Sequence, residues 1–214
     1  MDQISAGFLT VFLAVGGLAV ARWLQARGVT IQWSRRLPGV TGGGAFLVAV
    51  LWLDVWTAVV IAASLTGIIA FLRIGLGRRL QGVTSEGRSQ VWAEITYPAA
   101  RTLSLAVGWA LLGDRWLAFI PIAFMAWGDG VGGLLREIFV SRRRIPGRWP
   151  AAAMLGACLP SAALFQPYWI AAAAAVTATG TEYYSPRVPW LRDDNLFVVA
   201  ASLAVMAVLT IAVC

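Results

Sequence analysis

Long apolar runs separated by short polar stretches dominate this chain of 214 residues. An α-helix needs about 20 residues to cross the hydrocarbon of a bilayer. The runs lie at about 4–21, 39–53, 55–72, 91–112, 116–140, 151–165, 169–186 and 195–213. The second and sixth runs are short, so each is expected to begin in the interface or to tilt little. The pattern predicts an all-α, polytopic transmembrane bundle of about seven or eight helices, forming a single integral membrane domain over 1–214.

The composition supports this prediction. The chain is 59% hydrophobic and only 13% charged, whereas a soluble domain is about one quarter charged. Disorder is excluded as well, because it requires low hydrophobicity and high charge. We therefore expect the lipid bilayer as a partner, with the chain as a multi-pass protein of the cell membrane.

The cationic residues are all arginines, with a net charge of +7 and no histidine. Such a charge could indicate nucleic-acid binding, but basic loops in a membrane chain mark the cytoplasmic side, and no nucleic-acid partner is expected. The arginines concentrate in the first, third, fifth and seventh connections between runs. Tryptophans near both ends of the runs are typical of interfacial belts. Eight crossings with both termini outside are predicted.

Ionisable residues within the runs require a structural or functional reason, because each costs about 2.5–3.5 kcal/mol on insertion scales. With the predicted topology they favour the cytoplasmic half of the bundle. One interpretation is a set of structural ion pairs, Glu94 with Arg136 or Asp129 with Arg101. The residues concerned are Glu94, Arg101, Asp129, Arg136, Glu137 and Glu182.

Asp129 has an unusual setting, in Trp127-Gly128-Asp129-Gly130-Val131-Gly132-Gly133. The small-xxx-small pair Gly128 and Gly132 is typical of closely packed membrane helices. Each glycine also weakens a helix by roughly 1 kcal/mol relative to alanine. That cost is better explained if the backbone approaches a ligand there, or if the helix breaks to line a cavity.

A second polar feature precedes the last run, where Asp193, Asp194 and Asn195 follow one another. These residues could simply cap the last helix. Together with Asp129 they could also hold a magnesium ion, which takes oxygen ligands. The sequence has no Walker loop with its lysine, which excludes that class of nucleotide site.

Several of these segments resemble one family. The segment Gly128-Asp129-Gly130-Val131-Gly132 resembles the Gly-Asp-x-x-Ala signature of the CTP-dependent lipid-alcohol kinases, such as dolichol, phytol and polyprenol kinases. The stretch from Glu182 to Asn195 resembles the family's acidic segment, and Arg148-Trp149 its basic one. Glu94 with Tyr97-Pro98 is similar to its central helix. The resemblance covers about residues 85–213. At the family's N-terminal Arg-Lys-x-x-His pattern this chain reads Arg35-Arg36-Leu37-Pro38-Gly39, without the histidine.

The resemblance implies phosphorylation of an isoprenoid alcohol by CTP with Mg²⁺ at the cytoplasmic membrane face. Asp129 would coordinate magnesium or accept the hydroxyl proton, and Asp193 and Asp194 would share the metal. The implied substrate- or nucleotide-binding residues are Glu94, Arg101, Gly128, Gly130, Arg36, Arg142, Arg148, Glu182 and Asn195. The cluster 142–144 could equally be a topological anchor.

Other classes stay open. A cytidylyltransferase that makes a CDP-lipid would share the membrane, CTP and magnesium. A transporter would also bury charges around a broken helix, and a non-catalytic protein would explain the missing histidine. Homo-oligomer formation is compatible with each.

Overall fold

The computed structural model describes residues 1–29, 31–75, 88–140, 148–184 and 194–213. This part of the chain is all-α, with eight helical rods, as the apolar runs predict. The rods are α1 (Gln3–Ala26), α2 (Ile31–Trp52), α3 (Val55–Gly75), α4 (Arg88–Ser104) continued by η1 (Leu105–Leu111), then α5 (Arg115–Ala123) continued by η2 (Phe124–Gly128), α6 (Asp129–Leu135) and η3 (Arg136–Val140), and finally α7 (Arg148–Ala162), α8 (Tyr168–Tyr184) and α9 (Asp194–Val213). The segments η1, η2 and η3 are π-helical.

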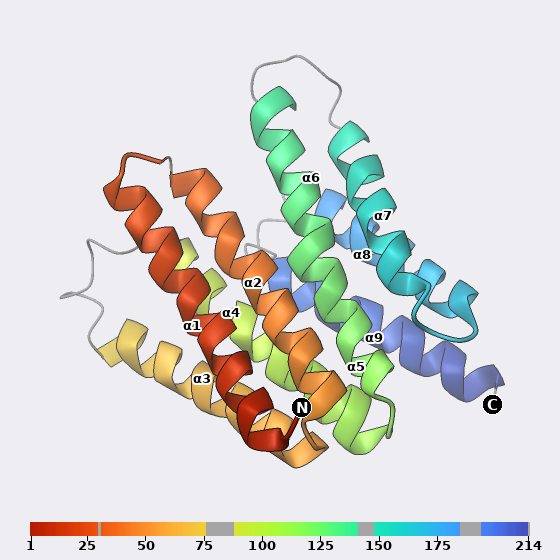
Figure 1. Cartoon of the computed structure of the whole chain (residues 1–214). Helices are drawn as coiled ribbons and strands as arrows, with labels where there is room; N and C mark the ends of the chain where they lie inside the picture. Colours follow the sequence, from red (N-terminus) through yellow and green to blue (C-terminus); the bar gives the residue numbers. More distant parts are fainter. Residues whose placement is uncertain (30, 76–87, 141–147, 185–193, 214) are drawn as a thin grey trace.

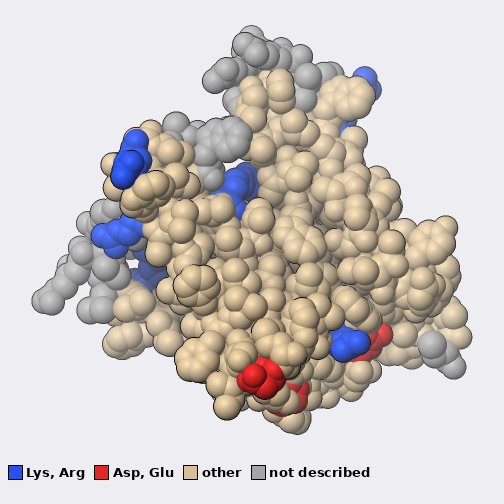
Figure 2. Space-filling view, in the orientation of Figure 1, with Lys and Arg blue, Asp and Glu red and all other residues tan. Residues whose placement is uncertain are grey.

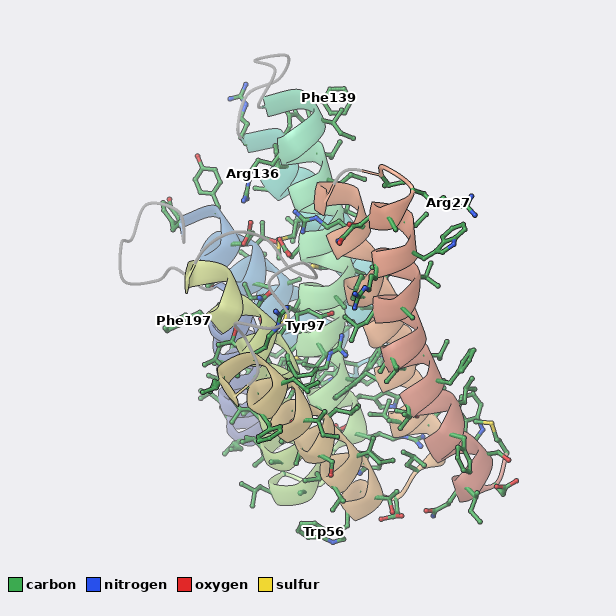
Figure 3. All side chains as sticks on the ribbon, turned by 90° about the vertical axis from the view of Figure 1, so that its left-hand side faces the viewer. Arg27, Trp56, Tyr97, Arg136, Phe139 and Phe197 are labelled. Carbon is green, nitrogen blue, oxygen red and sulfur yellow. The ribbon has the colours of Figure 1, made fainter. Side chains whose placement is uncertain are left out.

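Helices that are consecutive in the chain pack as neighbours, α1 on α2, α3 on α4 and α7 on α8 (Figure 1). Tight turns join α2 to α3 and η1 to α5 at one end of the bundle, and both chain termini lie at this end too. We call it the turn end. At the opposite end lie Arg27 and Arg136, whereas Trp56 lies at the turn end (Figure 3). We call this opposite end the arginine end.

Aspartates begin three helices at the turn end. The backbone N–H groups of Ser5, Thr57 and Trp116 donate to Asp2, Asp54 and Asp114 at 2.8, 3.0 and 2.7 Å. These are N-caps, which satisfy backbone donors that a helix leaves unpaired. Hydrogen bonds from Ser5 and from Thr57 hold the pKa values of Asp2 and Asp54 below their usual range. Figure 2 shows acidic side chains at this end and most of the visible basic ones toward the other.

The rod from α5 to η3 is the centre of the bundle. Its residues 117–126 are all buried, so this helix is enclosed on every side, as expected of a core helix. By contrast, α1 and α3 turn large apolar side chains outward, among them Phe8, Phe12 and Phe71. Such exposed apolar surface marks a contact with lipid or protein.

Four helices are long and apolar enough to cross a membrane, namely Gln3–Ala26, Val55–Gly75, Arg115–Leu135 and Asn195–Val213. The length and composition of these helices support the prediction of a multi-pass membrane protein. Eight crossings and the cytoplasmic location of the arginine end stay predictions.

Candidate functional site

Asp129 forms an ion pair with Arg36. Asp129 is the first residue of α6 and Arg36 belongs to the first turns of α2, so 93 positions separate them in the sequence. Arg36 Nη1 lies 3.3 Å from Asp129 Oδ2, and the two side chains are 33% and 22% exposed. The pair therefore joins the central rod to a peripheral helix and stays partly accessible.

The depth of this pair follows from the geometry of the central rod. Trp116 and Arg136 are twenty residues apart in one continuous rod, which is about 30 Å at the α-helical rise and matches the hydrocarbon thickness. Asp129 is seven residues before Arg136, or about 10 Å below it. This places the carboxylate in the half of the rod toward the arginine end.

The glycine-rich segment does not break the helix. The rod continues through η2 into α6, so the alternative of a broken helix is wrong. The backbone is instead π-helical up to Gly128, directly before Asp129. Such π segments are frequent at functional sites.

The glycines around Asp129 have different neighbours. A Cβ at Gly128 would overlap Cys158 Sγ, and one at Gly132 would lie 3.1 Å from Met154 Cβ. Both positions therefore let α7 approach closely, as the small-xxx-small pair predicts. A Cβ at Gly133 would overlap the guanidinium of Arg36, whereas nothing lies within 4 Å of the Cβ position at Gly130. Gly133 makes room for the ion pair, and Gly130 borders open space.

Arg101 is a residue of α4 and packs against α2 further along that helix from Arg36. Its Nη2 donates to the hydroxyl of Tyr97 at 2.6 Å, and its guanidinium carbon stands 4.2 Å from the centroid of the Tyr97 ring. Tyr97 in turn donates to the carbonyl of Gly39 at 3.0 Å, and a Cβ at Gly42 would overlap the guanidinium. Gly42, nearly two turns after Arg36, thus makes room for a second arginine.

The guanidinium of Arg101 has a hydrogen-bond donor that no described residue uses. Arg101 Nε is buried and has no hydrogen-bond partner among the described residues, and no described carboxylate forms an ion pair with the side chain. A buried polar group without a partner is costly. An anionic ligand with several oxygen acceptors would supply the missing interaction.

Arg136 and Glu182 form a second ion pair between described residues. Arg136 Nη2 lies 2.6 Å from Glu182 Oε1, and Glu182 is only 3% exposed. The pair connects η3 to the end of α8 (Figure 3 labels Arg136). The expected pairing of Asp129 with Arg101 is wrong, because Asp129 contacts Arg36 and Arg101 contacts Tyr97. The expected pairing of Glu94 with Arg136 stays a prediction, because the side chain of Glu94 lies outside the described residues.

For the remaining predicted site residues, the structure describes few contacts or none. Arg148 is exposed at the start of α7, and Asn195 is half-buried near the start of α9. Arg142 and Asp193 lie outside the described residues, as do the side chains of Glu94 and Asp194. The described residues contain no group of three His, Cys, Asp or Glu side chains that could hold a metal. Asp129 alone could still contribute to Mg²⁺ binding, because this ion is usually held by one or two carboxylates together with substrate phosphates.

Arg36 of α2 was predicted from the sequence, but the glycines that accommodate the two arginines were not. Gly42 makes room for Arg101, and Gly133 makes room for Arg36. A signal was present, since Gly42-Gly43-Gly44 is the longest run of glycines in the chain, and such residues allow close approach between membrane helices.

No family model, no curated protein and no solved structure matches this chain. The resemblance to the lipid-alcohol kinases stays a hypothesis that rests on the quoted segments.

Proposed function

We propose that this protein is a membrane-embedded phosphotransferase that moves the γ-phosphoryl group of CTP to an isoprenoid alcohol. The observation that carries the proposal is the Asp129–Arg36 pair, about 10 Å inside the apolar rod. Beside it stands Arg101 of α4, which packs against Gly42 of α2 and whose buried Nε has no partner among the described residues. Phosphoryl transfer depends mainly on positioning and on neutralising charge. Two arginines and one carboxylate on neighbouring helices provide groups for both.

The roles follow from the chemistry of each group. Arg36 and Arg101 would bind phosphate oxygens, which the planar guanidinium can contact with two donors. The alcohol oxygen would bond to the γ-phosphorus as the bond to the β,γ-bridging oxygen breaks and CDP leaves. The hydroxyl proton would pass to the carboxylate of Asp129. When bound, Mg²⁺ would neutralise phosphate charge, and Asp129, Asp193 and Asp194 are the residues that we expect to hold it.

Several candidates keep a role only through the resemblance, namely Glu94, Gly128, Gly130, Arg142, Arg148 and Asn195. Glu182 is better explained as a structural residue, because Arg136 already holds its buried carboxylate. The arginine end would face the cytoplasm and attract the triphosphate electrostatically.

The proposal is tested by incubating the purified protein in lipid nanodiscs with labelled CTP and a panel of polyprenols. We expect label from the γ-phosphate to enter the lipid in a magnesium-dependent reaction, with excess ATP competing poorly. Label entering from the α-phosphate would assign the protein to the cytidylyltransferases. No transfer from either position would contradict both enzymatic functions.

A further inference from the structure

The seam between α2 and the central rod is closed toward the turn end. A Cβ at Gly43 would lie 2.8 Å from the indole nitrogen of Trp127 and 2.9 Å from Ala126 Cβ, so the two helices pack tightly here. The indole N–H also points to the carbonyl of Val40, at 3.4 Å. Trp127 therefore seals this part of the seam.

Toward the arginine end the same seam is open. Nothing lies within 4 Å of the Cβ position at Gly130, and the flanking Val40 and Val131 are 48% and 41% exposed. Arg36 and Asp129 lie in the same part of the seam, one on each helix. Figure 2 shows a hollow between the upper parts of α2 and α6 with basic atoms recessed in it. We call this region, formed by these five residues, the α2–α6 opening.

In a chain that spans the membrane, we expect the opening to face lipid rather than water. Trp127, Gly130, Val131 and Leu134 are spaced as neighbours on one helix face, and all four are at least partly exposed. At about 10 Å below Arg136 the surroundings of a spanning helix are acyl chains. An ion pair exposed there is costly. A ligand with a polar head on the pair and an apolar chain outside would remove that cost.

We infer that the α2–α6 opening is the lateral access route and binding site of the lipid alcohol. The hydroxyl donates to Asp129 and accepts from Arg36, and the isoprenoid chain leaves over Gly130, between Val40 and Val131. The missing side chain at Gly130 gives the chain its path. This inference rests on the proposed function for the identity of the acceptor, and it assigns the nucleotide to the arginine end of the same site.

The test uses the full chain in nanodiscs and a polyprenol that carries a photoreactive diazirine near its hydroxyl end. After irradiation, we expect the label on peptides of α2 and α6 around Val40 and Val131. Val131→Trp narrows the opening, so it should reduce labelling and raise the KM for the alcohol at least tenfold. The matched control is Val60→Trp on α3, where Val60 is 61% exposed, and it should change neither. Val40→Trp narrows the opening from the other helix and replaces Val131→Trp if that variant does not fold.

The outcomes separate this inference from the proposed function. One outcome is that α2 and α6 are labelled, that Val131→Trp suppresses this labelling, and that no nucleotide phosphorylates the alcohol. This outcome supports the lipid-binding role of the opening and contradicts the kinase function. Phosphorylation together with label on other helices contradicts the opening and supports the kinase. Undiminished labelling in both tryptophan variants of the opening also overturns it.

Discussion

Two arginine–carboxylate pairs connect the central rod to neighbouring helices, and they differ in the length of the contact and in the burial of the carboxylate. In the Arg136–Glu182 pair the atoms are 2.6 Å apart and the glutamate is 3% exposed. In the Arg36–Asp129 pair they are 3.3 Å apart and both side chains are partly exposed. A short contact to a buried carboxylate is typical of a structural connection. A longer, accessible contact beside an open seam leaves room for a ligand, which is why the site is assigned to Asp129.

The largest expected effect separates these two roles directly. Asp129→Asn should reduce phosphoryl transfer by at least a thousandfold, because an amide neither accepts the hydroxyl proton nor binds a metal as an ionised ligand, a loss worth several kcal/mol of transition-state stabilisation. The thermal unfolding of the variant should stay close to that of the unchanged protein. Transfer assays and unfolding in the same detergent measure both. Near-normal turnover would make Asp129 a structural residue like Glu182.

The converse change tests the structural pair. Arg136→Gln removes the guanidinium from a buried carboxylate, and breaking such a pair costs about 3 kcal/mol, the lower end for buried pairs because Arg136 is itself 40% exposed. We expect a lower unfolding temperature together with a retained KM for the nucleotide. Arg22→Gln, at an exposed position of α1, is the matched control for loss of one positive charge. A variant as stable as this control would show that the pair contributes nothing.

The smallest expected effect comes from a substitution that disturbs only the Arg36–Asp129 pair. Gly133→Ala places a methyl group where the Arg36 guanidinium lies, so the arginine must shift and activity should fall about tenfold, equivalent to about 1.4 kcal/mol. Stability should rise, because alanine favours a helix over glycine by about 1 kcal/mol. Gly156→Ala on α7, where nothing lies within 4 Å of the Cβ position, should gain stability without losing activity. Equal activities in the two variants would contradict the role of Arg36.

The sequence predicts the rods much better than it predicts their contacts. Apolar runs mark where helices form, and all eight rods of the described chain follow them. The second run begins at 39, however, whereas α2 already begins at Ile31. The apolar run stops at the polar residues Arg35 and Arg36 and at Pro38, so hydropathy places the start of the helix after them. The helix nevertheless includes all three residues.

The partners of the charged residues could not be predicted in the same way. Arg36 and Asp129 lie 93 positions apart, and their meeting depends on how α2 is rotated and shifted against the central rod. Packing across non-adjacent helices decides that register, and apolar periodicity on a single helix does not contain it. Residues seven positions apart lie on nearly the same face of an α-helix, yet Asp129 and Arg136 contact different helices.

The π-helical segment before Asp129 has a consequence for the length of the chain. A π segment accommodates an additional residue in a turn that an α-helix would complete with fewer, and each residue of an α-helix advances the side chain by about 100° around the axis. Deleting one residue within Phe124–Gly128 would therefore let the rod close into a regular α-helix. Because the π turn and the α turn complete about the same rotation, the residues after the deletion would keep their direction relative to α5, and Asp129 would still point toward Arg36. A deletion in a regular α-helical part of the rod, such as Arg115–Ala123, would instead turn everything after it by about this angle and carry the carboxylate away from its partner. The π segment is in this sense the one place before the site where the number of residues can change by one without changing the direction of the carboxylate.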